Sequence, residues 1–240
     1  MKILLIGYGK MGRLIASTAG AAGDEIVGVF HRENLGALEN TGKIADVVID
    51  FSQPSTLPAV EEYIRRTGTA LVSGTTGYSA EELARVRALG DCAPVLWAAN
   101  YSIGVAVFYR LLRQISDTLK PDFDIEMTET HHNQKADAPS GTAKLLLQAI
   151  DPAGEYTPVY GREGACGKRD AKEIGVHALR GGTVAGTHTV HFFGPDEELE
   201  ITHRAASRQI FVNGALSMAR RMAGKPNGVY DLQTLLFGEG

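Results

Sequence analysis

The chain of 240 residues is poor in cysteine, in aromatic residues and in long apolar runs. Its two cysteines, Cys92 and Cys166, cannot build the disulfide framework of a small secreted domain, and no histidine or cysteine spacing is typical of a metal site. No segment approaches the ~18 apolar residues of a membrane span, and the N-terminal apolar run is too short for a signal peptide. These absences predict a cytoplasmic protein that binds neither metal nor membrane.

An excess of positive charge is also missing. Lysine and arginine total 24 residues against 28 for aspartate and glutamate, so the formal net charge is −4. Proteins that bind nucleic acid usually carry a strong basic excess. Nucleic acid is therefore not an expected partner, and chemistry on a small ligand is the better expectation.

Short apolar runs alternate with helical patterns over the first 100 residues. Runs typical of strands buried on both faces cover 3–6, 26–30, 46–51, 70–73 and 95–98. Helices fill the intervals, and the sequence Ser79-Ala80-Glu81-Glu82 matches a capping box that opens one of them. Strands alternating with helices predict a Rossmann-like, doubly wound parallel sheet.

The pattern changes after Ser102. A long helix is expected over 103–119, a half-buried alternating strand over 123–130, and a helix over 140–150 with Ser140 as its N-cap. Residues 151–173 are predicted to form a loop. Further strands are expected at 175–179, 187–193 and 199–205, the last two joined by the turn Gly194-Pro195-Asp196-Glu197 into an antiparallel hairpin.

These patterns predict two domains of the α/β class. Residues 1–102 and 213–240 form the dinucleotide-binding domain, to which a helix over 212–223 returns. Residues 103–212 form a smaller α+β domain with a mixed sheet, for substrate binding and oligomerisation.

A glycine motif follows the first strand and opens a helix. In Gly7-x-Gly9-x-x-Gly12, the first glycine permits a tight turn, the second lets a pyrophosphate approach, and the third allows close helix packing. The alternative is a glycine-rich turn without a ligand. The motif predicts that a dinucleotide binds the loop Gly7-Tyr8-Gly9-Lys10-Met11-Gly12.

The end of the second strand bears on cofactor choice. NAD specificity usually needs an acidic residue there, but the chain has His31 and Arg32, with Glu33 one step further. Arg32, with His31, is suited to the 2′-phosphate of NADP, unless it is merely a solvated surface charge. We therefore expect NADPH to be favoured, with NADH also usable.

Two further loops follow strands of the same predicted sheet. Ligands of open α/β sheets bind beyond the carboxyl ends of the strands, so both loops are candidates to contact the nicotinamide half. Ordinary strand-to-helix connections are the alternative for each. The residues are Gly74, Thr75 and Thr76 in one loop and Ala98, Ala99, Asn100 and Tyr101 in the other.

The stretch 129–143 contains the strongest chemical signal. His131, His132 and Lys135 offer proton donors and positive charge at the end of a strand. A helix then starts at Ser140-Gly141-Thr142, whose N–H groups and two hydroxyls suit a carboxylate. Adjacent histidines on a strand point to opposite faces, which does not suit zinc. The stretch predicts a site for an anionic substrate.

The whole stretch resembles the signature of the dihydrodipicolinate reductase family. The matching residues read Glu129-x-His131-His132-x-x-Lys135-x-Asp137-Ala138-Pro139-Ser140-Gly141-Thr142-Ala143. The segments Arg180-Gly181-Gly182 and Gly186-x-His188, together with the cofactor loops, also match in order, so the resemblance spans essentially the whole chain.

The resemblance implies reduction of a small cyclic dicarboxylate, 4-hydroxy-tetrahydrodipicolinate, in lysine and diaminopimelate biosynthesis. It implies that His131 and Lys135 donate protons, and that His132 with Gly141 and Thr142 holds the substrate carboxylate. It also implies a homotetramer. Many members carry Glu-Arg after the second strand where this chain has His31-Arg32, which favours NADPH here.

Two other functions fit parts of the sequence. One is a different two-domain, NAD(P)-dependent dehydrogenase of an amino-acid pathway, such as diaminopimelate dehydrogenase, which gives no reason for the 131–142 block. The other is a non-enzymatic dinucleotide sensor, which would have an inert second domain. The histidine–lysine cluster argues against both.

Overall fold

The computed structural model describes residues 1–238, which divide into two compact units. Unit 1 comprises Met1–Ser102 together with the chain from Gln209 onward, and unit 2 comprises Ile103–Arg208. The sequence prediction placed the second boundary after 212. The boundary lies earlier because helix α6 (Gln209–Met222) already begins at Gln209 and belongs wholly to unit 1.

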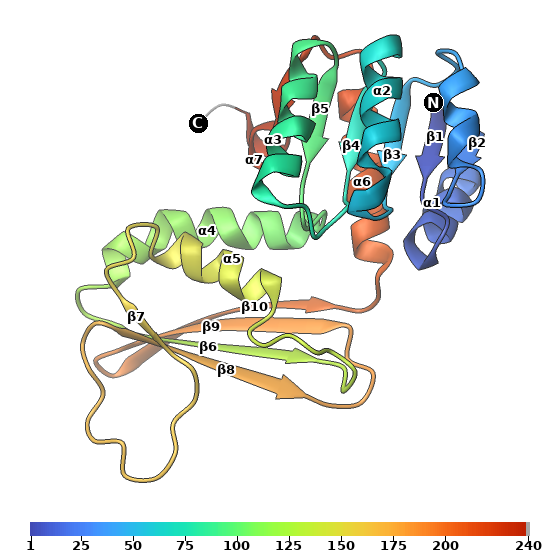
Figure 1. Cartoon of the computed structure of the whole chain (residues 1–240). Helices are drawn as coiled ribbons and strands as arrows, with labels where there is room; N and C mark the ends of the chain where they lie inside the picture. The colour runs from blue at the N-terminus through green and yellow to red at the C-terminus, as the bar shows by residue number, and fades with distance from the viewer. Residues whose placement is uncertain (239–240) are drawn as a thin grey trace. The chain divides into compact units, whose positions relative to one another are not determined.

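Unit 1 contains a six-stranded sheet in which every neighbouring pair is parallel, which confirms the Rossmann-like expectation (Figure 1). Its strand order is β11-β5-β4-β3-β1-β2. The chain leaves β1 toward β2 and then returns to the other side of β1 for β3, so the strand order reverses there. The strands are β1 (Lys2–Ile6), β2 (Glu25–Phe30), β3 (Val47–Asp50), β4 (Ala70–Ser73), β5 (Pro94–Trp97) and β11 (Gly228–Tyr230).

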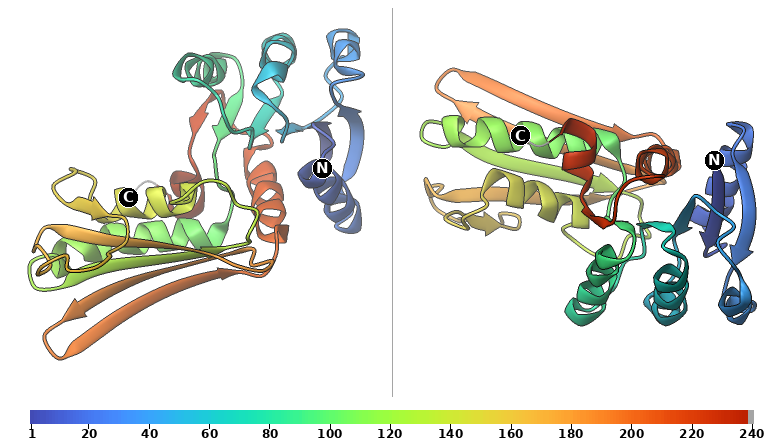
Figure 2. Two further views of the ribbon diagram at one scale, coloured as in Figure 1. Left: turned by 60° about the horizontal axis from the view of Figure 1, so that its bottom comes forward. Right: turned by 90° about the horizontal axis from the view of Figure 1, so that it is seen from above.

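Helices cover both faces of this sheet, because alternate residues of its apolar strands point to opposite sides. Ile3 and Leu5 pack with α1 (Lys10–Ala21), α6 and α7 (Leu232–Phe237). Leu4 and Ile6 pack on the other side with α2 (Leu57–Thr67) and α3 (Ala80–Ala88). Figure 2 shows α2 and α3 on one side of the sheet and α6 on the other. The short 3₁₀ helices are η1 (Leu35–Asn40), η2 (Pro54–Thr56) and η3 (Leu89–Asp91).

The predicted capping box at α3 is confirmed. The Ser79 hydroxyl accepts a hydrogen bond of 3.1 Å from the Glu82 N–H, and the Glu82 carboxylate accepts one of 2.8 Å from the Ser79 N–H. The pair satisfies two N–H groups that would otherwise lack partners at the helix start.

Unit 2 contains a mixed five-stranded sheet of order β10-β9-β6-β8-β7, as expected. Strands β7, β8 and β6 are parallel neighbours. Strand β9 runs antiparallel to both of its neighbours, β6 and β10. The predicted hairpin joins β9 to β10. The elements are β6 (Asp124–His131), β7 (Thr157–Val159), β8 (Glu173–Arg180), β9 (Gly186–Gly194), β10 (Glu197–Ala205), α4 (Ile103–Leu119) and α5 (Gly141–Ile150).

Helices α4 and α5 lie over one face of this sheet (Figure 1). Phe108 and Leu112 of α4 and Leu146 of α5 pack there against Met127 and Phe192 of the strands. Within residues 1–238, no helix covers the opposite face, and no helix is both long and apolar enough to cross a membrane.

Two short strands and one short α-helix, besides the 3₁₀ helices, were not predicted from the sequence. Strand β7 lies inside the predicted loop 151–173, and β11 and α7 follow the last predicted helix. Strands β7 and β11 each have only three residues, too few for a hydrophobic period to appear. Pairing with β8 and β5 creates these strands, which is tertiary information.

Candidate active site

Strand β6 places two polar side chains on its apolar face. Ile125 and Met127 are buried under the helices, and the same two-residue period continues to Glu129 and His131. Glu129 is fully buried and His131 nearly so. Buried polar groups require hydrogen-bond partners, so this face must supply them.

Glu129 receives those partners from two other segments and from its own strand. Arg180 of β8 donates to both carboxylate oxygens, at 3.0 Å to Oε2 and 2.8 Å to Oε1. The Ser140 N–H donates to Oε1 at 3.1 Å, and His131 Nδ1 contacts Oε2. Burial raises the pKa of the Glu129 carboxyl, but the bonds from Arg180 and His131 outweigh it, so this pKa lies below its ordinary value. Glu129 is therefore an anion at neutral pH.

His131 is fixed by its Nδ1 atom. Because Nδ1 faces Glu129, the other ring nitrogen, Nε2, is the atom available for chemistry. A Cβ added at Gly186 would lie 3.1 Å from Nε2, so a glycine there keeps that nitrogen uncrowded. Burial lowers the pKa of His131, Glu129 raises it, and the net pKa lies below the ordinary value.

The loop after β6 carries Lys135 and is held from two sides. Lys135 Nζ lies 2.8 Å from the Asp137 carboxylate, and Arg180 donates to the Asp137 carbonyl oxygen at 2.7 Å. The Gly181 N–H donates to the His131 carbonyl oxygen at 2.9 Å. The loop that follows the catalytic candidate is thereby attached to the Arg180-Gly181 turn.

The start of α5 has the features of an anion site. Ser140 is the N-cap, as predicted, and its hydroxyl accepts a hydrogen bond of 3.1 Å from the Ala143 N–H. Gly141 is exposed, and a Cβ added to it would meet nothing within 4 Å. The first turn of a helix presents N–H groups and a positive dipole end, so there is open space here for a carboxylate.

His188 supports this helix start from β9. Its Nε2 lies 3.0 Å from the Ser140 hydroxyl oxygen, and its ring packs edge-on against His131, with 5.1 Å between centroids. Burial, followed by the charge of His131, lowers the pKa of His188 to about 4. His188 is thus neutral at physiological pH and adds no charge beside His131.

Glu129, His131 and His188 bring potential ligand atoms within 4.8 Å of one another. Arg180 already occupies both Glu129 oxygens, and its positive charge opposes a cation at the same place. The arrangement therefore suits proton chemistry better than metal binding.

In unit 1, the glycine motif has the geometry that a dinucleotide requires. Gly7 has φ +91°, and a Cβ on it would overlap the Phe51 carbonyl oxygen. A Cβ on Gly12 would overlap the Gly7 carbonyl oxygen, which explains the third glycine. A Cβ on Gly9 would meet nothing within 4 Å. The second glycine therefore faces open space, the feature by which this motif admits a pyrophosphate.

The loops after β3 and β4 are tied together by a buried carboxyl group, Asp50. It accepts hydrogen bonds from Ser73 at 3.1 Å and Thr75 at 2.9 Å, and it contacts the Ser52 hydroxyl. Burial raises the pKa of Asp50 against the effect of these hydroxyls. Trp97 Nε1 donates to the Thr75 carbonyl oxygen at 2.9 Å. Asp50 therefore organises the loop that contains Gly74, Thr75 and Thr76, and Trp97 at the end of β5 is attached to that loop.

Some predicted cofactor residues have buried side chains. Tyr101 packs against Phe51, with 5.6 Å between ring centroids, and its hydroxyl donates to the Ser73 carbonyl oxygen at 2.8 Å. Thr75 is also buried, whereas Thr76 is exposed. The buried side chains of Tyr101 and Thr75 stabilise their loops. Exposed neighbours such as Thr76 are the ones whose side chains can contact a cofactor.

The turn after β2 lies beside the glycine motif, because the Gly7 N–H donates to the Phe30 carbonyl oxygen at 2.7 Å. The side chain of Asn34 accepts from the His31 N–H at 2.7 Å and closes this turn. Arg32 is exposed and forms no ion pair with any residue in 1–238. Its guanidinium is free to meet a phosphate.

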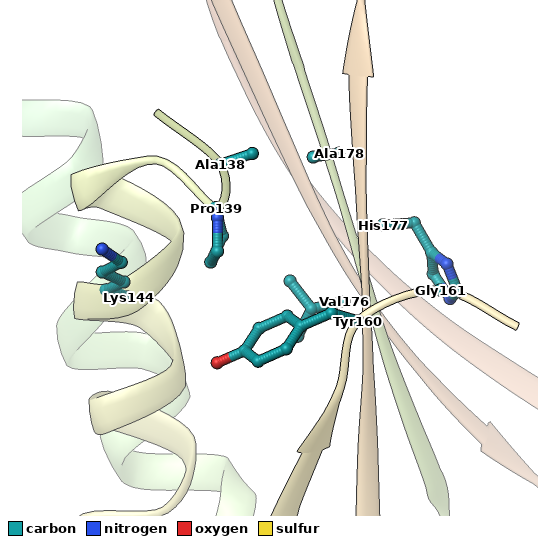
Figure 3. A pocket seen from close by; sticks show the side chains of 8 residues that line it. All are labelled: Ala138, Pro139, Lys144, Tyr160, Gly161, Val176, His177 and Ala178. Atoms are coloured by element: carbon teal, nitrogen blue, oxygen red, sulfur yellow. The ribbon is translucent and has the colours of Figure 1, made fainter. Parts of the chain in front are cut away.

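A separate cavity of about 700 Å³ lies in unit 2 between α5 and β8 (Figure 3). Tyr160 lies across it with its hydroxyl directed toward α5, and His177 points away. None of the residues predicted as catalytic or binding lines it. The lining residues are Ala138, Pro139, Lys144, Tyr160, Gly161, Val176, His177 and Ala178.

Sequence reasoning assigned no role to Asp50, Glu129, Arg180 or His188. Glu129, Arg180 and His188 lie inside matched motifs, and Glu129 also continues the alternation of β6 onto a buried face. A carboxylate at such a position indicates a buried charge, which requires a cationic or hydrogen-bonding partner from elsewhere in the chain. For Arg180 and His188 the signal is the strand register, which pairs Arg180 with His131 and His188 with Glu129.

Comparison with known proteins decides the family. Two family models match the chain: "Dihydrodipicolinate reductase, N-terminus" over residues 1–101 and "Dihydrodipicolinate reductase, C-terminus" over residues 104–236. The chain belongs to the dihydrodipicolinate reductase family. This membership confirms the resemblance seen in the 129–143 stretch.

Curated relatives match along nearly their full length. A 4-hydroxy-tetrahydrodipicolinate reductase of Exiguobacterium sp. is 40% identical over 241 residues, covering 98% of this chain and 95% of the relative. One of Staphylococcus aureus strain JH9 is 43% identical over 252 residues, covering 98% and 100%.

Solved structures agree with the fold. A dipicolinate-bound dihydrodipicolinate reductase from Paenisporosarcina sp. TG-14 superimposes with a TM-score of 0.77 at 21% identity and covers 99% of each chain. The C. glutamicum DAP dehydrogenase, at 13% identity and a TM-score of 0.57, covers 100% of this chain and 96% of its own. These likenesses concern the fold alone.

Proposed function

We propose that this chain performs its family's reaction with His131 as the proton donor and NADPH as the favoured reductant. The chain is an oxidoreductase, a 4-hydroxy-tetrahydrodipicolinate reductase of lysine biosynthesis, by membership of the family. The observation that carries the proposed mechanism is the buried contact between His131 and Glu129 on β6. This contact engages Nδ1, so Nε2 is the imidazole nitrogen that can transfer a proton to the substrate.

His131 supplies the proton that reduction requires. Hydride addition to a conjugated cyclic imine leaves negative charge on the substrate, and the N–H bond at His131 Nε2 breaks to quench it. A histidine suits this task because its ordinary pKa lies near neutral pH. Burial lowers the pKa of His131, and Glu129 opposes this by favouring the protonated ring. Lys135, on the loop attached to β8, contributes positive charge beside the reacting anion and serves as a second proton donor.

The start of α5 holds a substrate carboxylate. The N–H groups of Gly141 and Thr142, the Thr142 hydroxyl and the His132 side chain form the proposed site, and Ser140 is the buried N-cap that sets the start of α5. The open space beside Gly141 and the dipole of α5 support it. The Paenisporosarcina relative is described as dipicolinate-bound, and a small cyclic dicarboxylate of that kind is the proposed ligand here.

The residues of unit 1 fit a dinucleotide. The open side of Gly9 leaves room for the pyrophosphate, and the 74–76 loop organised by Asp50 supports the nicotinamide half. When bound, the dihydronicotinamide supplies the hydride. Arg32 is proposed to meet the 2′-phosphate of NADPH, so NADPH is favoured and NADH remains usable.

A coupled assay tests the reaction and the cofactor preference together. Substrate is generated freshly from pyruvate and aspartate semialdehyde by the preceding synthase, and oxidation of NADPH and NADH is followed. We expect rapid, substrate-dependent oxidation. Arg32→Ser should raise KM for NADPH about ten- to a hundredfold, the effect of losing one charged hydrogen bond to phosphate, and leave KM for NADH unchanged.

Arg87→Ser is the matched control, because Arg87 is a basic residue in the last turn of α3, away from the proposed cofactor loops. Equal loss with NADPH and NADH in Arg32→Ser contradicts the proposed phosphate contact. A folded protein that binds NADPH but oxidises neither cofactor with substrate contradicts the reductase mechanism.

We propose that the chain assembles as a homotetramer through the sheet face of unit 2 that lies opposite α4 and α5. Leu179 and Phe193 are large apolar side chains exposed on that face, one near each end of β6. Light scattering should give the mass of four chains, and Phe193→Asp should lower it. A wild-type protein with the mass of one chain contradicts this assembly. The cytoplasmic location stays a prediction.

A further inference from the structure

We propose that Glu129 and Arg180 act as a coupled pair of positioning residues, which directs the His131 proton to Nε2 and prevents its loss to Glu129. This inference deepens the proposed function and rests on His131 being the proton donor. Neither residue touches substrate or cofactor in the proposed mechanism. Both act through the His131 ring.

Glu129 selects the nitrogen that reacts. Its Oε2 contacts His131 Nδ1 inside the protein, so a proton on Nδ1 is held by the carboxylate. A protonated ring then offers only its Nε2–H to an acceptor. The missing Cβ at Gly186 leaves space at that nitrogen, where a Cβ would lie 3.1 Å away. Glu129 thus sets the direction in which the acid points, as orienting carboxylates do for catalytic histidines.

Arg180 keeps Glu129 from becoming the base. A buried carboxylate without a cation would gain affinity for a proton and would compete for it with the neighbouring imidazole. Two hydrogen bonds, of 2.8 and 3.0 Å, place the guanidinium on both oxygens of Glu129. The Ser140 N–H adds a third donor at 3.1 Å. The carboxylate therefore stays ionised while the proton stays on the histidine.

The charges around His131 act in opposite directions. Glu129 on β6 favours the protonated ring, whereas Lys135 on the following loop and Arg180 on β8 disfavour it. His188 on β9 packs against the ring and is neutral at working pH, since its own pKa is lowered to about 4. From α5, the N-cap Ser140 donates its N–H to Glu129 and brings no charge. Removing the glutamate and removing the arginine should therefore shift the His131 pKa in opposite directions.

The decisive experiment measures that pKa directly. The seven histidines of the chain are followed by NMR titration of the full-length protein, and His131 is assigned by its absence in His131→Gln. In Glu129→Gln the pKa of His131 should fall further, because the two cations remain and the carboxylate is gone. In Arg180→Met it should rise. General loosening of the site would instead move the value upward in both variants, toward that of an exposed histidine.

Kinetics provide a second readout. Glu129→Gln should lower kcat about ten- to a hundredfold, a part of the 10²–10⁴-fold that a positioned acid contributes, with KM for NADPH unchanged. The pH above which kcat declines should shift with the His131 pKa. Arg180→Lys keeps a cation beside Glu129 and should retain more kcat than Arg180→Met.

Arg85→Met is the matched control. Arg85 donates twice to Glu61, at 3.0 and 2.6 Å, in unit 1, so its loss removes an arginine–glutamate pair without affecting His131. Its kcat and the His131 titration should equal those of the wild type. Should Arg180→Met fail to fold, Arg180→Lys and Glu129→Gln still test the coupling.

An upward or unchanged His131 pKa in Glu129→Gln overturns this inference. The proposed function fails on a different result, namely wild-type turnover in His131→Gln. Opposite pKa shifts without any change in kcat would retain the coupled pair but remove its relevance to catalysis, and that outcome also contradicts the positioning role.

Discussion

His131→Gln is expected to lower kcat by about 10²–10⁴-fold, the usual contribution of a positioned general acid. The glutamine amide can still donate a hydrogen bond to Glu129, so the Glu129–Arg180 pair keeps its partners in the variant. An amide has no proton to give at neutral pH. Turnover should therefore collapse while thermal stability and NADPH affinity stay near wild-type values.

Single-turnover kinetics, thermal unfolding and NADPH titration together check this expectation. His177→Gln is the matched control, because His177 is the same residue type on β8 and contacts Glu126, outside the proposed active site. It should keep wild-type kcat. A His131→Gln enzyme with more than about a tenth of wild-type kcat would refute the assignment of His131 as the acid.

Gly9→Ala should abolish tight NADPH binding in a protein that folds normally. Gly9 has φ −78° and ψ −157°, which alanine also adopts, and its added methyl group would meet no protein atom within 4 Å. The methyl group would instead occupy the space proposed for the pyrophosphate. The dissociation constant for NADPH should rise at least about tenfold, equivalent to ~1.4 kcal/mol.

Two glycines of α1 serve as comparisons for Gly9. Gly20→Ala also places its methyl group in open space and should stabilise the helix by up to about 1 kcal/mol without changing NADPH affinity. Gly12→Ala would overlap the Gly7 carbonyl oxygen and should lower the melting temperature as well as the affinity. Calorimetric titration and thermal unfolding separate the three. Unchanged NADPH affinity in Gly9→Ala would contradict dinucleotide binding at this loop.

The fold was largely predictable because its signals are local. Strands β1, β3 and β4 are short apolar runs, and Ser79 and Ser140 are N-caps whose side chains mark where helices start. Strand β11 was not predictable, because its place is fixed by the neighbouring edge of β5 rather than by any pattern of its own.

The candidate site residues could be named from the sequence, but the contacts between them could not. His131, Lys135 and Ser140 are close together in sequence, so one motif contains them. Arg180 and His188 arrive from other strands, and only the register of β6 with β8 and β9 places them beside His131 and Glu129. No local period encodes contacts between segments about 50 residues apart.

The division of unit 1 between the two ends of the chain has a consequence for synthesis. Helix α6 supplies Val212, Leu216 and Met218 to one side of the unit 1 core, so that core stays open until this helix has left the ribosome. Unit 2 is continuous and emerges entirely before α6. The layer of unit 1 that packs α2 and α3 is built from N-terminal residues alone, whereas the layer that packs α6 is completed only after unit 2 has been synthesised.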